Sequence, residues 1–186
     1  MTDIPLASRL DRLAAADPGA LRGRSLLATQ DWSTTEIELL CQTGELLELL
    51  DRTGLPTRLF PHAPHLALFF DASTRTKSSW AGAAARLGAS PVILEGGSTQ
   101  VSHGETAEET GAMLGMNAHA LGIRHDLILG EGNLFQRGVA KGIADYLRAT
   151  GSERVVPVVN LQCDVDHPTQ ALADLCWLRE RFPGGL

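Results

Sequence analysis

The chain has 186 residues, with 16 Lys and Arg against 22 Asp and Glu, a formal net charge of −6 and 44% hydrophobic residues. This composition excludes a disordered, collagen-like or disulfide-rich protein, and no apolar run approaches the roughly 18 residues of a membrane span. The acidic balance argues against a nucleic-acid partner. The three cysteines, Cys41, Cys163 and Cys176, lack Cys-x-x-Cys spacing, which predicts reduced thiols and a cytoplasmic protein.

The first third of the chain predicts two helices. Residues 8–16 form a short amphipathic pattern that stops at Asp17-Pro18-Gly19. A second helix is expected after Ser33, because Ser33 and Glu36 have the spacing of a capping box. We expect residues 1–25 to be an N-terminal helical extension and residues 26–186 to form the main domain.

From His65 onward, short apolar runs alternate with helical segments. Strands are predicted at residues 65–70, 91–94, 118–123 and 155–159, and helices at residues 80–87, 105–116, 131–149 and 167–182. This alternation predicts an α/β fold with a parallel sheet of about four strands and helices on both faces. Ligands of such sheets bind beyond the carboxyl ends of the strands, so we expect a site built from residues 71–77, 124–126 and 160–170.

The first candidate site is Ser73-Thr74-Arg75-Thr76-Lys77, which lies between a buried strand and a helix. Three hydroxyls, two cations and the free N–H groups of a helix start predict an anion site for a phosphoryl group. The alternative is an ordinary Ser/Thr helix cap beside two solvated bases, but a cap needs only one hydroxyl. The loop does not have the spacing of a P-loop, and Gly130-Glu131-Gly132 lacks the third glycine of a dinucleotide fingerprint.

The second candidate is the segment Asp166-His167-Pro168-Thr169-Gln170, which has the features of a helix start, with Pro168 first and Asp166 as a cap. His167 and Gln170 share one helical face and can hold a small amide, although they are equally well explained as helix-terminal residues. Taken alone, Arg124 at the end of an apolar segment is typical of a surface charge rather than a ligand, and Gln100 indicates nothing. The sequence has no convincing set of metal ligands and no nucleophilic serine elbow.

Four segments, in order and spacing, resemble the N-terminal half of the aspartate/ornithine carbamoyltransferase superfamily. They are the Ser73–Thr76 loop, Gly122-Ile123-Arg124, the 98–103 loop and His167-Pro168-Thr169-Gln170. The segments 103–106, 122–124 and 159–174 are similar to a bacterial subgroup of knotted carbamoyltransferases whose acceptor is not settled. The resemblance covers residues 26–182.

The resemblance implies transfer of a carbamoyl group from carbamoyl phosphate to the amine of an amino acid or related acceptor, without a metal or other cofactor. Ser73, Thr74, Arg75 and Thr76 would hold the phosphate. Arg124, His167 and the Thr76 hydroxyl would face the carbamoyl oxygen, and Gln170 would accept from the amide nitrogen. Gln100 would reach the site of a neighbouring subunit, which implies a homotrimer.

Two departures from the family pattern stand out. The family continues its loop with Arg and an aromatic-Glu pair, where this chain has Lys77, Trp80 and Ala81. The resemblance therefore implies that a supporting Arg–carboxylate pair is missing. Family members also carry a second domain that binds the acceptor and contains the knot, and we expect this domain to be absent from the chain.

Two alternatives remain at the level of sequence. The chain could be a carbamoyl phosphate-binding module that catalyses nothing, or a fragment without its acceptor domain. A phosphosugar or phospho-amino-acid enzyme could use the same anion loop, but that reading leaves the spacing of His167 and Gln170 unexplained.

Overall fold

Four parallel strands form the centre of the fold in the computed structural model, which describes residues 6–182. The strands are β1 (Pro64–Phe69), β2 (Ser90–Glu95), β3 (Ala120–His125) and β4 (Val158–Cys163). Their order across the sheet is β2-β1-β3-β4, and every neighbouring pair is parallel. The predicted α/β class is confirmed. The outer ends of the predicted segments 1–25 and 26–186, residues 1–5 and 183–186, lie outside the described residues.

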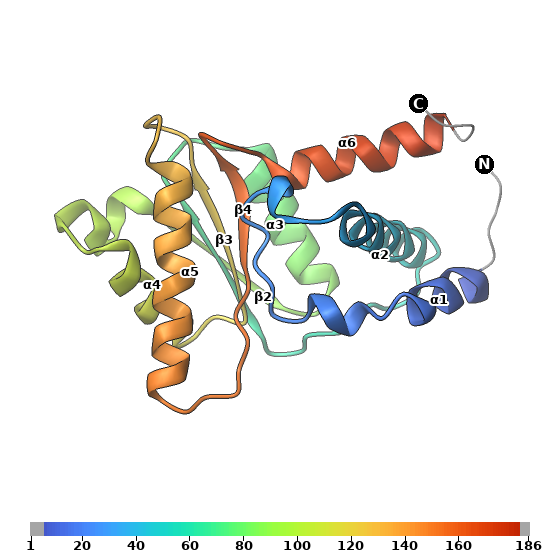
Figure 1. Cartoon of the computed structure of the whole chain (residues 1–186), viewed down its shortest axis with the longest axis horizontal. Coiled ribbons are helices and arrows are strands. Elements are labelled where there is room, and N and C mark those ends of the chain that lie inside the picture. Colours follow the sequence, from blue (N-terminus) through green and yellow to red (C-terminus); the bar gives the residue numbers. More distant parts are fainter. Residues whose placement is uncertain (1–5, 183–186) are drawn as a thin grey trace.

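Helices cover both faces of the sheet, as predicted. They are α1 (Leu6–Ala15), α2 (Thr34–Arg52), α3 (Arg75–Arg86), α4 (Ala107–Gly115), α5 (Gly132–Ala149) and α6 (Pro168–Arg181). Figure 1 shows α4 and α5 together on one side of the sheet and α3 on the other. Helices α1, α2 and α6 extend away from the sheet on the α3 side. Within residues 6–182, no helix is both long and apolar enough to cross a membrane.

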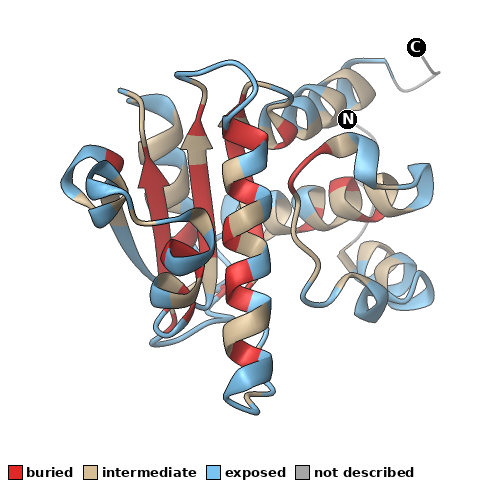
Figure 2. Ribbon diagram, turned by 60° about the vertical axis from the view of Figure 1, so that its left-hand side comes forward, coloured by how far each residue is buried: buried red, intermediate tan, exposed pale blue. Residues whose placement is uncertain are grey.

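The core lies on both faces of the sheet because successive strand side chains point to opposite sides. On one face, Leu121, Ile123 and Val158 pack against Val139 and Ile143 of α5. On the other face, a smaller cluster joins Ala67, Phe69 and Leu161 to Trp80 of α3 and to two further strand residues. Figure 2 shows the central strands as almost continuously buried, whereas α5 alternates buried and exposed positions along its length.

The helix starts follow local signals in the sequence. The Ser33 and Glu36 capping box is present at the start of α2, as predicted, and Thr106 with Glu109 forms a second one at α4. Helix α3 begins at Arg75, five residues before the predicted start at Trp80. The prediction was wrong because the polar residues after Thr74 were assigned to a turn, whereas they form the first turn of the helix.

The fourth strand differs most from its prediction, since β4 runs over Val158–Cys163 and not over residues 155–159. Two polar side chains, Asn160 and Gln162, interrupt the apolar pattern and concealed the second half of the strand. Gln162 has a φ of 142°, and the register between β3 and β4 shifts at this point. This bulge bends the strand beside the carboxyl edge of the sheet. As predicted, Pro157 stands at a strand end, immediately before β4.

Leu26 adds a short segment to the outer edge of β4. Its backbone N–H donates to the carbonyl oxygen of Val158 at 2.8 Å, and its carbonyl oxygen accepts from the N–H of Asn160 at 2.9 Å. The segment that precedes α2 therefore covers part of an edge strand and lies next to the loop that follows β4.

Candidate functional site

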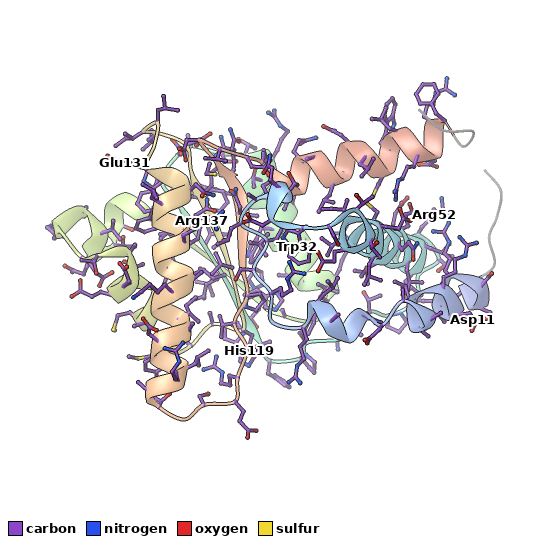
Figure 3. All side chains as sticks on the ribbon, in the orientation of Figure 1. Asp11, Trp32, Arg52, His119, Glu131 and Arg137 are labelled. Carbon is purple, nitrogen blue, oxygen red and sulfur yellow. The ribbon has the colours of Figure 1, made fainter. Side chains whose placement is uncertain are left out.

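The predicted site residues lie at the carboxyl edge of the sheet or just beyond it, with the exception of Gln100. Figure 3 marks the two ends of the sheet: His119 precedes β3 at one end, and Glu131 precedes α5 at the other. At the Glu131 end, the loops after β1, β3 and β4 meet. This is the position where parallel sheets bind ligands.

The loop after β1 leads directly into the first turn of α3. Thr74 is the residue before the helix, and its side chain makes no capping hydrogen bond. Thr74 is therefore not an ordinary helix cap, which was the alternative interpretation of this residue. Thr74 and Arg75 are exposed, while Ser73 and Thr76 are half-buried.

Lys77 occupies the position where the family pattern has an arginine. Its Nζ lies 2.6 Å from Oε1 of Glu95 at the end of β2, and 5.2 Å from the centre of the Phe69 ring. The loop is thus supported by a lysine–carboxylate pair that connects α3 to the edge strand.

Arg124 is the side chain that joins β3 to the anion loop. Its Nη1 donates to Oγ of Ser73 at 3.3 Å and to Oγ1 of Thr76 at 3.4 Å. The other side of the guanidinium contacts Asp126, with Nε to Oδ1 at 3.4 Å and Nη2 to Oδ2 at 3.2 Å. The Arg124 side chain is only 17% exposed. The structure therefore brings together three predicted residues, Ser73, Thr76 and Arg124.

Two carboxyl groups in this cluster were not among the predicted site residues. The backbone N–H of Asp126 donates to Oδ2 of Asp71 at 3.0 Å, and the two side chains also share a hydrogen bond. Both residues directly follow neighbouring parallel strands, which is the signal that could have identified them. Each lies in a segment that the sequence marked as site-forming.

The two carboxyl groups have pKa values shifted in opposite directions. Burial, and then the hydrogen bond to Asp126, raise the pKa of Asp71. Burial alone would raise the pKa of Asp126, but the hydrogen bond from Asp71 and the charge of Arg124 outweigh it, so the pKa of Asp126 is lowered. Asp71 is therefore the carboxyl group of the pair that holds its proton to the higher pH, and Asp126 is the one that ionises first.

His167 lies directly before α6, and the charges of Arg124 and Asp126 act on its ring. Burial, followed by the positive charge of Arg124, lowers the pKa of His167 below 6.5, so the ring is neutral at pH 7. Its Nδ1 lies 3.2 Å from Oγ1 of Thr169. Gln170 is exposed, and its Nε2 donates to Oδ1 of Asp174 at 2.7 Å. The structure thus places His167 near Arg124 but shows Gln170 bonded within its own helix.

Asp166 does not cap α6, contrary to the prediction. Its Oδ1 accepts from the backbone N–H of His167 at 2.7 Å. Its Oδ2 accepts from the backbone N–H of Thr29 at 2.6 Å and from the Thr29 hydroxyl at 2.8 Å. Asp166 therefore ties the segment before α2 to the loop that carries His167. Pro168 is the first residue of the helix, as predicted.

A buried polar network around Asn160 holds the loop between β4 and α6 in place. Asn160 is fully buried, and its Nδ2 donates to the carbonyl oxygens of Leu27 at 2.8 Å and Asp166 at 3.1 Å. Its Oδ1 accepts from the backbone N–H of Gln162 at 2.9 Å and from Nε2 of Gln136 at 3.0 Å. The network joins β4, α5 and the segment before α2 beneath His167.

On the outside of the molecule, a related ion pair joins the same elements. Arg137 of α5 contacts Oδ2 of Asp31 at 2.8 Å. Figure 3 shows Arg137 between α5 and the segment that carries Trp32. The segment before α2 is therefore attached to the site region both inside and at the surface.

Gln100 is the predicted site residue that lies apart from the others. It is exposed and begins a short 3-10 turn, Gln100–His103, in the loop between β2 and α4. Figure 1 shows this loop projecting outward beside α4, on the side of the molecule opposite α6.

The chain matches a known protein family over most of its length. The family model "Aspartate/ornithine carbamoyltransferase, carbamoyl-P binding domain" matches residues 24–180. The Escherichia coli K12 protein named "Putative carbamoyltransferase YgeW" is 38% identical over 87% of this chain and 41% of its own length. The catabolic ornithine carbamoyltransferase of Treponema denticola is 35% identical over 87% of this chain and 43% of its own length.

Solved structures share the fold. Ornithine carbamoyltransferase from Pyrococcus furiosus superposes with a TM-score of 0.70 at 30% identity, over 87% of this chain and 46% of that one. The chain thus spans less than half the length of each of these three relatives.

Proposed function

We propose that this chain, which belongs to the carbamoyl phosphate-binding domain family of the aspartate/ornithine carbamoyltransferases, binds carbamoyl phosphate at the carboxyl edge of its sheet. The observation that carries the proposal is the convergence of the Arg124 guanidinium with the Ser73 and Thr76 hydroxyls beside the first turn of α3. A planar guanidinium, hydroxyls and helix N–H groups are the donors that a phosphoryl group and a carbonyl oxygen require.

In the proposed complex, the phosphate lies against Ser73, Thr74, Arg75 and Thr76. Thr74 and Arg75 are exposed and can turn toward a ligand. The free N–H groups at the start of α3 form the positive end of the helix dipole, and this end attracts the negative phosphate. The positive side chain of Arg75 adds to the same attraction.

The carbamoyl group lies toward Arg124, with its oxygen facing Arg124, His167 and the Thr76 hydroxyl. A neutral His167 donates one N–H to this oxygen and adds no second charge beside Arg124. Gln170 accepts from the carbamoyl nitrogen once its amide leaves Asp174.

The reaction we propose for the whole enzyme is carbamoyl transfer. An uncharged amine attacks the carbonyl carbon, the bond from that carbon to the phosphate oxygen breaks, and the amine loses a proton. The residues of this chain position the donor and stabilise the negative charge on the carbonyl oxygen and the leaving phosphate. Neither step calls for a metal or an organic cofactor.

The amine, an amino acid or related acceptor, binds outside residues 26–186 in this proposal, on a second domain. Gln100 completes the site of a neighbouring subunit in a cytoplasmic homotrimer, and its exposed loop suits that role. For these 186 residues taken alone, with residues 1–25 as a helical extension, we propose binding of carbamoyl phosphate without transfer.

The test is calorimetric titration of the chain with carbamoyl phosphate and, separately, with inorganic phosphate. Losing one charge-assisted contact costs about 1.5–3 kcal/mol, so Arg75→Ala should weaken carbamoyl phosphate binding about 10- to 100-fold. Arg86→Ala is the matched control, because it removes the same charge from the other end of α3, where Arg86 pairs with Asp51 at the surface.

The control variant should bind within about twofold of wild type, since exposed charges this far apart are screened by salt. Wild-type affinity in the folded Arg75→Ala variant would contradict the proposed phosphate site. Absence of carbamoyl phosphate binding by the folded wild-type chain would contradict the proposal for these 186 residues.

A further inference from the structure

A carboxylate contacts one side of the Arg124 guanidinium, and two hydroxyls contact the other. Nε and Nη2 contact the two carboxylate oxygens of Asp126 at 3.4 and 3.2 Å, whereas Nη1 extends toward the hydroxyls of Ser73 and Thr76. A two-point contact of this kind fixes the plane of the guanidinium as well as its position. Asp126 therefore determines which nitrogen of Arg124 is presented to the anion loop.

The sheet register explains how Asp126 comes to face Asp71. Phe69 pairs with Arg124 in the β1–β3 ladder, and Phe70 donates its backbone N–H to the Arg124 carbonyl oxygen at 3.0 Å. Asp71 and Asp126 each lie two residues beyond that pair, and residues two apart share a face of a strand. The register thus places two carboxyl groups side by side at the edge of the site.

Two adjacent carboxylates would repel each other, and this cluster has two groups that relieve the repulsion. One is the positive charge of Arg124, which contacts Asp126. The other is the Asp71 carboxyl group itself, because burial and the hydrogen bond to Asp126 raise its pKa, so that it ionises at a higher pH than Asp126. Asp71 also accepts the backbone N–H of Asp126 at 3.0 Å, so it holds both the backbone and the side chain of its neighbour.

We propose that Asp126 is a positioning residue that directs Nη1 of Arg124 at the donor site, and that the Asp71 carboxyl group, which accepts the backbone N–H of Asp126, holds Asp126 in place. The inference rests on the proposed function, because it assigns Arg124 to the carbamoyl oxygen. Asp126 contacts no ligand in this arrangement, and it acts through Arg124. The donor site is thus organised before carbamoyl phosphate arrives, which lowers the cost of ordering the arginine on binding.

The first arm of the test follows the Arg124 side chain itself, by NMR of arginine Nε–H groups in the 186-residue chain. The Arg124→Lys variant assigns the signal by removing it. In wild type, exchange of the Arg124 Nε–H with water should be slow compared with exposed Arg75. Asp126→Asn should accelerate it about tenfold, whereas Asp145→Asn, which alters an exposed aspartate paired with Arg148 and Lys141, should leave it unchanged.

The second arm measures the ratio of carbamoyl phosphate affinity to inorganic phosphate affinity. General changes in site charge affect both anions and cancel in this ratio, whereas loss of the contact with the carbamoyl oxygen does not. Asp126→Asn and Arg124→Lys should each lower the ratio about tenfold, and the double variant should lower it no further than Arg124→Lys alone. Additive losses would overturn the role of Asp126 as a residue that acts through Arg124.

Asp71 is tested by a pair of substitutions. Asparagine keeps a side-chain oxygen that can accept the backbone N–H of Asp126, so Asp71→Asn should retain slow exchange at Arg124. Asp71→Ala removes the partner of Asp126 and should accelerate exchange. Equal acceleration in the two variants would overturn the role of the hydrogen bond from Asp126 to the side chain at position 71, and no effect of either would remove Asp71 from the mechanism.

The two proposals fail in different ways. Fast exchange at Arg124 in wild type, or exchange that Asp126→Asn does not change, overturns the positioning role while anion binding stands. If neither anion binds, the proposed function fails, and the NMR arm still decides whether Asp126 holds Arg124.

Discussion

Replacing Asn160 by alanine should lower the unfolding free energy by about 3–5 kcal/mol. The side chain is fully buried and makes five hydrogen bonds, to Leu27, Asp166, Gln162, Gln136 and the Sγ of Cys163. Alanine leaves the Gln162 backbone N–H and the Leu27 carbonyl oxygen without their closest partners, and each buried unsatisfied group costs about 1–3 kcal/mol. The space left by the amide adds a smaller cavity cost.

The other three partners limit the loss, since each keeps a second bond. The Sγ of Cys163 still accepts from the N–H of Val165 at 3.4 Å. The Asp166 carbonyl oxygen still accepts from the N–H of Cys163 at 2.9 Å, and Gln136 still donates to the carbonyl oxygen of Ile123 at 3.3 Å. The assay is urea unfolding followed by circular dichroism, with Asn117→Ala as the matched control because Asn117 is exposed. The control should change stability by less than about 0.5 kcal/mol. A loss below about 1 kcal/mol for Asn160→Ala would refute the reasoning.

Three further predictions follow from packing and titration. Gly142→Ala places a Cβ 2.0 Å from a carbonyl oxygen of α4 and should lower the free energy of unfolding in urea by about 1–3 kcal/mol. Its control, Gly44→Ala, meets nothing within 4 Å and should raise that free energy by about 0.5–1 kcal/mol. Equal effects of the two variants would contradict the close packing of α4 on α5. Burial and a neighbouring thiol raise the pKa of Cys176 to about 12. Iodoacetamide at pH 8 should therefore modify Cys176 about a thousandfold more slowly in the folded chain than in the unfolded chain, and comparable rates would contradict the raised pKa. Burial lowers the pKa of His65 and His167 below 6.5. The unfolded chain therefore binds more protons than the folded chain just below pH 6.5, and the free energy of unfolding should fall as the pH is lowered from 7 to 5.5. A constant urea midpoint over that range would count against the buried neutral rings.

The sequence predicts the parallel sheet well because most strands of this fold are buried on both sides. Residues 65–70 form an unbroken apolar run, and β1 is buried at five of its six positions. The start of α2 is equally legible, since Ser33 and Glu36 form a capping box through local contacts alone. Signals of this kind depend on neighbours in the chain and need no knowledge of the tertiary structure.

The predictions were wrong where a polar residue finds its hydrogen-bond partners far away in the sequence. Asn160 is a polar residue inside a strand, and bonds to distant partners such as Leu27 and Gln136 compensate the burial of its amide. Asp166 was predicted to cap α6, but it bonds to Thr29, which is 137 residues away in the chain. The sequence around either residue contains no sign of these partners.

The candidate site was predictable in its segments but not in its contacts. The rule that ligands bind beyond the strand ends indicated residues 71–77 and 124–126, and the family motif supplied Arg124. The role of Asp126 depends on the β1–β3 register, which places it beside Asp71. Register is set by the assembled sheet, so this contact emerges only from the structure.

A crystal structure of this chain with phosphonoacetamide would test the central claim most directly. In this compound a methylene group replaces the bridging oxygen of carbamoyl phosphate, so it cannot transfer its carbonyl group. We predict the phosphonate at the first turn of α3 against Ser73, Arg75 and Thr76, with the carbonyl oxygen facing Arg124 and His167. A ligand bound elsewhere, or a phosphonate that contacts none of these side chains, would contradict the account.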